Sequence, residues 1–131
     1  MHSYVIDTYA WIEYFNGTQQ GSNAKEYIEG GHDISVPSLV LAELADSFHQ
    51  GRVGMEWEAI LRFILVKCSV IELSPEIAFE AARIEKAKRP KHHDFSLADG
   101  IILATARKTG SILVTGDEHL TDENGVVNIR V

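Results

Sequence analysis

The sequence predicts a single α/β domain with a mostly parallel central sheet. Short apolar segments with the composition of buried strands alternate with longer segments whose apolar residues recur at helical spacing. Such alternation calls for right-handed crossover connections, which place successive strands parallel to one another. The length of 131 residues fits one domain, residues 1–131, which buries a sizeable core without disulfides or metals as staples.

Composition narrows the class of protein. Apolar residues make up 45% and charged residues 24%, the profile of a soluble globular protein. The formal charge of −7 argues against a simple basic nucleic-acid-binding module, but it allows an enzyme whose acids gather in a metal site. The sequence shows no signal peptide and no apolar run of the roughly 20 residues that span a membrane, so we expect a cytoplasmic protein without a membrane partner.

The strands follow from short apolar segments bounded by turn residues. They are expected at residues 3–7, 33–36, 69–73, 111–115 and 126–131. The expected helices cover residues 8–15, 23–29, 38–50, 55–67 and 75–88, and a sixth includes residues 96–106 and stops at Gly110. Gly30, Ser74 and Pro90 mark helix ends, and Pro37 suits the first turn of the helix that follows it.

Four acids are expected at one edge of this sheet. Asp7 closes the first strand, and Asp117 lies two residues past the fourth strand. Glu43 lies in the helix that follows the second strand, and Asp99 lies near the start of the helix that leads into the fourth strand. Ligands of open parallel sheets bind beyond the carboxyl ends of the strands, so these four acids can converge on a ligand site.

Each acid also has an ordinary structural explanation. Asp7 suits a helix N-cap, Glu43 could face solvent, and Asp117 could be a turn residue. Asp99 in the first turn of a helix interacts favourably with the helix dipole by roughly 0.3–1 kcal/mol. Each explanation is strong by itself. Together, however, they do not explain why all four acids are expected at the same edge of the sheet.

Convergence of the acids would favour a bound cation. Two carboxylates about 5 Å apart repel by roughly 3 kcal/mol at an effective dielectric constant of about 20. Such groups raise one another's pKa or hold cations. Oxygen ligands suit Mg²⁺ and Mn²⁺, and two such ions about 3.5–4 Å apart would balance four charges and activate water for attack on phosphorus. The absence of His and Cys from these four positions disfavours zinc.

The segments VIDTYAWIEYF, PSLVLAELAD, SLADGIILATA and ILVTGDEHL together resemble those of the PIN-domain nucleases. More narrowly, they resemble the VapC-type ribonuclease toxins of prokaryotic toxin–antitoxin pairs. The resemblance runs from the first strand to VVNIRV and covers essentially the whole chain. Short apolar runs around one acid are common, so the order and spacing of the four segments carry the resemblance.

The resemblance implies a three-layer α/β/α fold and endonucleolytic cleavage of RNA that depends on Mg²⁺ or Mn²⁺. It implies a homodimer and a cognate antitoxin, VapB-like or of another type. The catalytic metal ligands of the family map onto Asp7, Glu43, Asp99 and Asp117, with Thr115, and Thr8 after Asp7, as supporting residues. Gly100 stands where Ala is more usual, which weakens helix propensity by roughly 1 kcal/mol but leaves the acids intact.

In the mechanism that the resemblance implies, Asp7, Glu43 and Asp99 hold the metals. Asp117 either completes a second metal site or orients a coordinated water. Attack of this water would leave a 5′-phosphate and a 3′-hydroxyl.

A basic segment, residues 86–94, precedes the Asp99 helix. It could hold the RNA backbone through basic side chains, or it could be a solvated helix end. The candidate RNA contacts are Lys88, Arg89, Lys91, His92 and His93. Asp94 is expected as the N-cap of the following helix in preference to a metal ligand. Asp46, one helical turn from Glu43, could support the metal ligands from behind, or it could be exposed to solvent.

The remaining conspicuous residues suit a structural role. Cys68, within an apolar run, is expected to be a buried and inert thiol. The aromatic residues are expected in the core or in an interface, and residues 10–15 could equally bury against an antitoxin helix or a second protomer. These aromatic residues are Trp11, Tyr14, Phe15, Trp57 and Phe63.

Three other functions compete with a toxin. A PIN-domain nuclease could process RNA without an antitoxin, and a neighbouring small reading frame for an antitoxin would separate the two. A non-catalytic binding module for RNA or protein would keep the fold without the chemistry. A phospho-accepting receiver is disfavoured, because it needs two adjacent acids after the first strand, where Asp7 stands between Ile6 and Thr8, and because no Lys follows the last motif.

Overall fold

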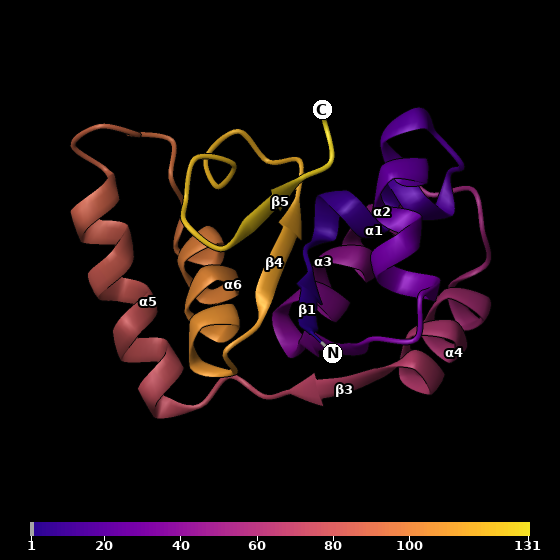
Figure 1. Cartoon of the computed structure of the whole chain (residues 1–131), viewed down its shortest axis with the longest axis horizontal. Coiled ribbons are helices and arrows are strands. Elements are labelled where there is room, and N and C mark those ends of the chain that lie inside the picture. The colour runs from indigo at the N-terminus through magenta and orange to yellow at the C-terminus, as the bar shows by residue number, and fades with distance from the viewer. Residues whose placement is uncertain (1) are drawn as a thin grey trace.

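The computed structural model describes residues 2–131 as one parallel sheet with helices on both sides (Figure 1). The strands lie in the order β3-β2-β1-β4-β5, and every neighbouring pair is parallel. The strands are β1 (Ser3–Ile6), β2 (Asp33–Pro37), β3 (Cys68–Ile71), β4 (Ile112–Thr115) and β5 (Val126–Asn128). This arrangement confirms the α/β class and the parallel sheet.

Six helices connect the strands. They are α1 (Thr8–Phe15), α2 (Gln19–Glu29), α3 (Ser38–His49), α4 (Trp57–Lys67), α5 (Pro75–Lys88) and α6 (Leu97–Lys108). Figure 1 shows α5 and α6 on one side of the central strands and α1, α2 and α4 on the other. From β1 to β2 to β3 the chain advances toward one edge of the sheet, and from β3 to β4 it returns in the opposite direction. Because the crossovers are right-handed, the helices of these two parts lie on opposite faces of the sheet.

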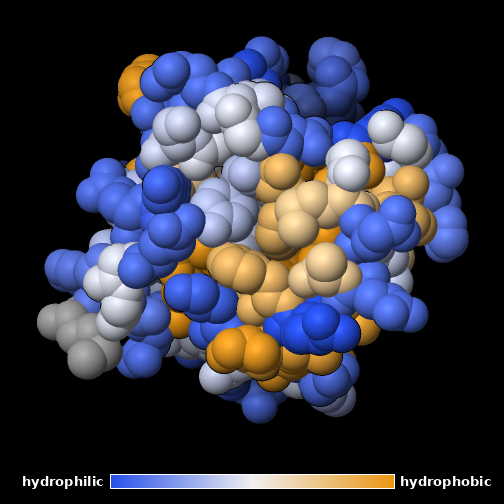
Figure 2. All heavy atoms as spheres, turned by 90° about the vertical axis from the view of Figure 1, so that its right-hand side faces the viewer, coloured by the Kyte–Doolittle hydropathy of each residue, from blue (hydrophilic) through white to orange (hydrophobic). Residues whose placement is uncertain are grey.

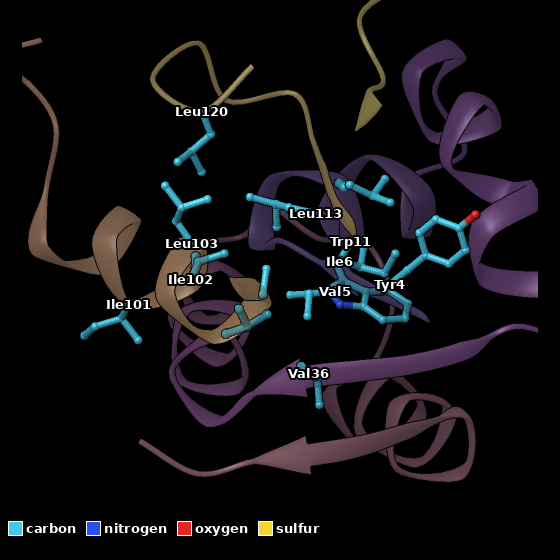
Figure 3. Close-up of a cluster of buried hydrophobic side chains, with 14 of the residues drawn as sticks. Tyr4, Val5, Ile6, Trp11, Val36, Ile101, Ile102, Leu103, Leu113 and Leu120 are labelled. Carbon is cyan, nitrogen blue, oxygen red and sulfur yellow. The ribbon is translucent and has the colours of Figure 1, made fainter. Parts of the chain in front are cut away.

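The central strands carry the core. Val5 and Ile6 of β1 and Leu113 and Val114 of β4 are fully buried, as expected for a parallel strand covered on both faces. Figure 3 shows Val5, Ile6 and Leu113 among side chains from both helical layers, with Trp11 on one side and Ile102 and Leu103 of α6 on the other. The carboxyl ends of β1 and β4 are therefore held by well-packed elements.

Several helix boundaries agree with the sequence analysis. Helices α1 and α5 have the expected limits, and the hydroxyl of Ser74 caps α5 by accepting a hydrogen bond from Ile77 N. The N-cap of α6 is Ser96, so the assignment of that role to Asp94 was wrong. Ser96 and Asp99 form a reciprocal capping box, while Asp94 lies two residues outside it and is exposed.

Helix α2 begins four residues earlier than the sequence indicates. Thr18 caps it by accepting a hydrogen bond from Gly21 N. Gly21 resembles a loop residue in the sequence, but it lies where α1 and α2 approach closely: a Cβ atom at this position would be 2.1 Å from the carbonyl oxygen of Glu13. Contact between the helices, rather than turn formation, accounts for this glycine.

Three smaller differences concern strand ends and the thiol. Pro37 ends β2 and is the N-cap of α3 instead of lying in its first turn, β3 begins at Cys68, and β5 ends at Asn128. Cys68 is half-buried rather than buried, and desolvation raises the pKa of its thiol to about 12, so it stays protonated at neutral pH. Within the described residues, no helix has the length and hydropathy to span a membrane.

Gly100 permits close packing of α6 on α5. A Cβ atom at this position would lie 2.6 Å from the carbonyl oxygen of Ala81, a backbone atom that cannot rotate away. The helix-propensity disadvantage of glycine, about 1 kcal/mol relative to alanine, is therefore accepted where a methyl group would separate the two helices.

We predict that Gly100→Ala destabilises the fold even though alanine is the better helix former. The overpacking cost of about 1–3 kcal/mol exceeds the gain in propensity of about 1 kcal/mol. The measurement is the free energy of unfolding in urea. Gly54→Ala is the control, because a Cβ atom there would meet nothing within 4 Å. A Gly100→Ala protein as stable as the wild type would contradict this account of the α5–α6 contact.

Candidate metal-binding acid cluster

The candidate site lies at the carboxyl edge of the sheet, between β1 and β4. The chain leaves β1 toward β2 on one side and reaches β4 from the other, so the strand order reverses between these two neighbours. Crevices that bind ligands in open parallel sheets form at such switch points. Asp7 follows β1, and its backbone N–H extends the ladder by donating to Val114 O at 3.1 Å.

Asp7 is a buried carboxylate with a partner for each oxygen. It is 2% exposed and is the N-cap of α1, with Oδ1 accepting from Ala10 N at 2.8 Å. Oδ2 accepts a hydrogen bond from the hydroxyl of Thr115 at the end of β4. Desolvation nevertheless raises the pKa of Asp7 to about 7, and the charges of Asp117 and Glu43 add to this increase.

Glu43 approaches the same edge from α3. Its Oε1 accepts a hydrogen bond from the hydroxyl of Thr8 at 2.6 Å, which ties α3 to the first residue of α1. Burial raises the pKa of Glu43, and Asp99 and Asp117 raise it further. Glu43 is half-buried, so the alternative of a freely solvated side chain does not describe its position.

Asp99 combines a structural contact with a place among the acids. Its Oδ2 accepts from Ser96 N at 2.9 Å, and its own N–H donates to Ser96 Oγ at 3.0 Å. The carboxylate is buried at the positive end of α6, yet burial raises its pKa and Asp117 contributes to that rise, while His119 opposes it. The dipole explanation and the cluster therefore both apply to this residue.

Asp117 begins a short turn after β4. Its N–H donates to Thr115 Oγ1 at 2.9 Å, and its Oδ1 accepts from His119 N at 2.9 Å. Thr115 thus contacts both Asp7 and Asp117 through one hydroxyl group. The buried side chain of Leu120 anchors the turn in the core.

The four carboxylates act electrostatically on one another, but their side chains do not form a closed cage. Within residues 2–131, no three His, Cys, Asp or Glu side chains stand close enough together to enclose a metal ion as placed. The donor set itself suits a hard divalent cation, since it consists of carboxylate oxygens of which one, on Asp7, is desolvated and destabilised as an anion. The residues at this edge therefore fit the chemistry of Mg²⁺ or Mn²⁺.

Part of the basic segment 86–94 is engaged with acids, while Lys86 and Lys91 are exposed. Lys88 forms an ion pair with Glu123, Arg89 pairs with Glu85, and His92 lies 3.6 Å from Asp122. The exposed residues Lys91, His93 and Asp94 remain at the surface, with His93 3.6 Å from Asp94. This segment therefore offers less positive charge to a phosphate backbone than its composition indicates.

Two other residues considered in the sequence analysis, Asp46 and Trp11, lie outside the acid cluster. Asp46 is exposed and accepts a hydrogen bond from Gln50 Nε2 at 2.8 Å, although its charge contributes to the raised pKa of Glu43. Trp11 is fully buried and stacks on Phe15, which is half-buried, so residues 10–15 belong mainly to the core with a partly open rim.

Sequence reasoning missed a group beside the acids formed by Tyr9, Gly116 and Arg130. Arg130 Nε donates to Gly116 O, and its guanidinium carbon lies 4.8 Å from the centre of the Tyr9 ring. Gly116 has no room for a side chain, because a Cβ atom would lie 2.4 Å from the Tyr9 ring. No sequence pattern predicts this contact, because its three residues lie in separate segments that become neighbours only in the folded chain.

The sequence and the fold of this chain are similar to those of known proteins. A family model described as "PIN domain" matches residues 4–123. A toxin–antitoxin complex from Klebsiella pneumoniae has a TM-score of 0.74 and 23% identity, over 95% of this chain and 96% of that chain. VapBC2 from Rickettsia felis, bound to a promoter DNA fragment, has a TM-score of 0.71 and 18% identity, over 96% of each chain.

A third similar structure is Mycobacterium tuberculosis VapC20, described as a sarcin-ricin loop cleaving toxin. Its TM-score is 0.64 at 16% identity, over 87% of this chain and 91% of that chain. At these identities the three structures show a shared fold. The search of the curated proteins gives no match.

We predict that Asp7→Asn stabilises the metal-free protein at high pH. The folded-state pKa of Asp7, about 7, lies above its ordinary value of 3.8, so the folded state binds the proton more tightly. Its contribution is complete below pH 4 and is lost as the pH rises toward 7 and beyond. A tenfold change in proton affinity corresponds to about 1.4 kcal/mol, so the loss has a ceiling of about 4 kcal/mol.

The measurement is urea unfolding in EDTA at pH 5.5 and pH 8. The wild type should lose more stability between these pH values than Asp7→Asn, because Asn retains the cap without the charge. Glu43 and Asp99 contribute loss in the same direction in both proteins. Asp33→Asn, at an exposed residue of β2, is the control and should behave like the wild type. Equal pH dependence in the wild type and Asp7→Asn would refute the assignment.

Proposed function

The chain belongs to the PIN domain family, and on that premise we propose that it is a divalent-metal-dependent endoribonuclease, the toxin of a type II toxin–antitoxin pair. The observation that carries this proposal is the gathering of Asp7, Glu43 and Asp99 at the switch point, with Asp117 beside them. The pKa of each of the first three is raised by burial and by neighbouring acids. Carboxylates kept under such repulsion suit a site that binds cations.

These four acids would hold Mg²⁺ or Mn²⁺. A bound divalent cation lowers the pKa of its water for attack on phosphorus and stabilises the charge on the leaving oxygen. The chain's own contribution is to orient the carboxylates. Thr115 holds Asp7 and the backbone of Asp117 through one hydroxyl, and Thr8 holds Glu43. We expect hydrolysis to leave a 5′-phosphate and a 3′-hydroxyl.

Support for RNA as the substrate comes from the resemblance to ribonuclease toxins and from the similar fold of the toxin that cleaves the sarcin-ricin loop. The same acids would serve a PIN-domain nuclease that processes RNA without an antitoxin. A small reading frame encoded next to this one, whose product inhibits cleavage, would decide for the toxin.

An antitoxin and a second protomer are the proposed protein partners. The structures from Klebsiella pneumoniae and Rickettsia felis, which share the fold, are complexes of toxins with antitoxins or VapB proteins. Figure 2 shows apolar side chains gathered on the side of the molecule that α1, α2 and α4 form. On α4, Leu65 and Val66 are 50% and 81% exposed, so this side offers apolar surface to a partner helix.

We predict that Asp99→Asn abolishes RNA cleavage while the fold persists. The amide oxygen of Asn can still accept the hydrogen bond from Ser96 N, so the capping box is kept while the charge is lost. The measurement is cleavage of a mixed-sequence fluorescent RNA with Mn²⁺, with Mg²⁺ and with EDTA. We expect metal-dependent cleavage by the wild type, a loss of at least about 100-fold in Asp99→Asn, and 5′-phosphate ends on the products.

Ser96→Ala is the matched control for Asp99→Asn. It removes the cap and should cost about 1 kcal/mol of stability, but it should retain cleavage. Cleavage that persists in Asp99→Asn would restrict Asp99 to helix capping, and cyclic phosphate ends would exclude the proposed chemistry. A wild type that binds no Mn²⁺ in calorimetry and cleaves no RNA would favour the non-catalytic binding module.

We predict that Val66→Glu weakens inhibition by the antitoxin without affecting cleavage by the free enzyme. A charge on the exposed apolar surface of α4, where Val66 is 81% exposed, would have to be desolvated on binding. The measurement is cleavage in the presence of the purified product of the neighbouring reading frame. Ala82→Glu, which introduces the same charge at an exposed position of α5 on the opposite side of the molecule, is the comparison variant. Equal inhibition of the wild type and Val66→Glu would remove α4 from the proposed interface.

A further inference from the structure

The last residues of the described chain lie across the edge of the acid cluster and are firmly held there. Beyond β5 the chain continues past the tip of β4 toward the α1–α2 side (Figure 1). Ile129 N donates to Thr115 O at 2.9 Å. The side chain of Asn23 on α2 donates to Ile129 O at 2.8 Å and to Val131 O at 3.4 Å. These contacts fix the backbone on both sides of Arg130.

The side chain of Arg130 is oriented by two contacts. Nε donates to the carbonyl oxygen of Gly116, the residue between Thr115 and Asp117. The guanidinium group lies over the ring of Tyr9, two residues after Asp7, and the Tyr9 hydroxyl donates to Gln20 Oε1 at 2.5 Å. Cation–π stacking and one hydrogen bond therefore hold the guanidinium plane at the border of the acids.

Arg130, like the exposed residues Lys86 and Lys91 but unlike the other basic residues of α5 and α6, forms no ion pair with a carboxylate within residues 2–131. Among residues 2–131, ion pairs with carboxylates engage Arg83, Lys88, Arg89, Arg107 and Lys108. Arg130 forms none within this range, and only its Nε has a protein acceptor there. The remaining guanidinium N–H groups are therefore available to a ligand that approaches the acid cluster.

The charge distribution indicates which ligand this guanidinium suits. A chain of formal charge −7 with four acids at one edge repels a polyanion, and Lys88 and Arg89 of the basic segment 86–94 are engaged in ion pairs with Glu123 and Glu85. A planar, permanently charged guanidinium matches the geometry of a phosphate with paired N–H groups, and side-chain contacts to phosphates position a nucleic acid on a protein. A cation held between Tyr9 and Gly116 is placed to offset the repulsion.

We propose that Arg130 is a substrate-binding residue that holds a backbone phosphate of the RNA strand beside the acid cluster. The proposal rests on the proposed nuclease function and deepens it by naming the residue that positions the substrate. The stack on Tyr9 presets the guanidinium, so binding a phosphate requires little further ordering.

The test is the RNA concentration dependence of cleavage with Mn²⁺ by the wild type, Arg130→Gln, Arg130→Lys and Arg62→Ala. Gln retains an N–H donor for Gly116 O but loses the charge, and Arg62, exposed on α4, is the control. We expect Arg130→Gln to raise the half-saturating RNA concentration about tenfold, with the maximal rate and the half-saturating Mn²⁺ concentration within about threefold of wild type. Arg130→Lys should lie between the two, because it keeps the charge without the fork.

Salt dependence separates a phosphate contact from a structural role. For a single strand, loss of one phosphate contact lowers the slope of log affinity against log salt by about 0.7, and we expect this change in Arg130→Gln but not in Arg130→Lys. Thermal unfolding of each variant accompanies the kinetics.

Two results would overturn the proposal. An unchanged half-saturating RNA concentration and salt slope in Arg130→Gln, with or without a lower melting temperature, would restrict Arg130 to holding the chain end. A wild type that neither cleaves nor binds RNA would overturn the nuclease function, and the role of Arg130 with it. The first result leaves wild-type cleavage intact, so the two failures are distinguishable.

Discussion

The contact between the Thr115 hydroxyl and the Asp7 carboxylate joins the two central strands at the point where the candidate site forms. It bridges the ends of β1 and β4, and the same hydroxyl accepts the N–H of Asp117. The backbone N–H of Ile129 donates to the carbonyl oxygen of Thr115, and this hydrogen bond positions the chain segment that carries Arg130. The position of each group at this edge therefore depends on the register between β1 and β4, in which Ile6 lies beside Val114.

Helix capping and ligand chemistry share the same carboxylates. Asp7 caps α1 and Asp99 belongs to the capping box of α6, so two of the structural explanations are correct as far as they go. A cap places a carboxylate at a helix N-terminus, and here both helices begin at the same edge of the sheet. Each carboxylate oxygen accepts more than one hydrogen bond or cation, so capping leaves coordination capacity. The structural and functional explanations are compatible for these residues.

The sequence predicts best those features that depend on local chemistry. The end of β4 at Thr115, the limits of α1 and α5 and the cap at Ser74 follow from apolar periodicity and capping signals. The start of α2 was missed because Gly21 serves a contact with α1. Asp94 was expected as the cap because Asp suits that position, but Ser also suits it, and the backbone places Ser96 at the start of α6. Arg130 was missed because its partners lie in distant segments.

The acid cluster also lowers the stability of the metal-free fold, and the rest of the structure must offset this loss. In the absence of a cation, burial of Asp7 and repulsion from Asp117 and Glu43 oppose the charged form, and folding is weakened accordingly at neutral pH. A ligand that binds only the folded state returns this free energy by mass action. A carboxylate whose charged form is disfavoured, such as that of Asp7, persists only where the surrounding structure is rigid. This explains its place between β1 and β4, whose central residues are fully buried. Stability in the core and destabilised charge at its edge are thus parts of one arrangement, in which cation binding and folding support each other.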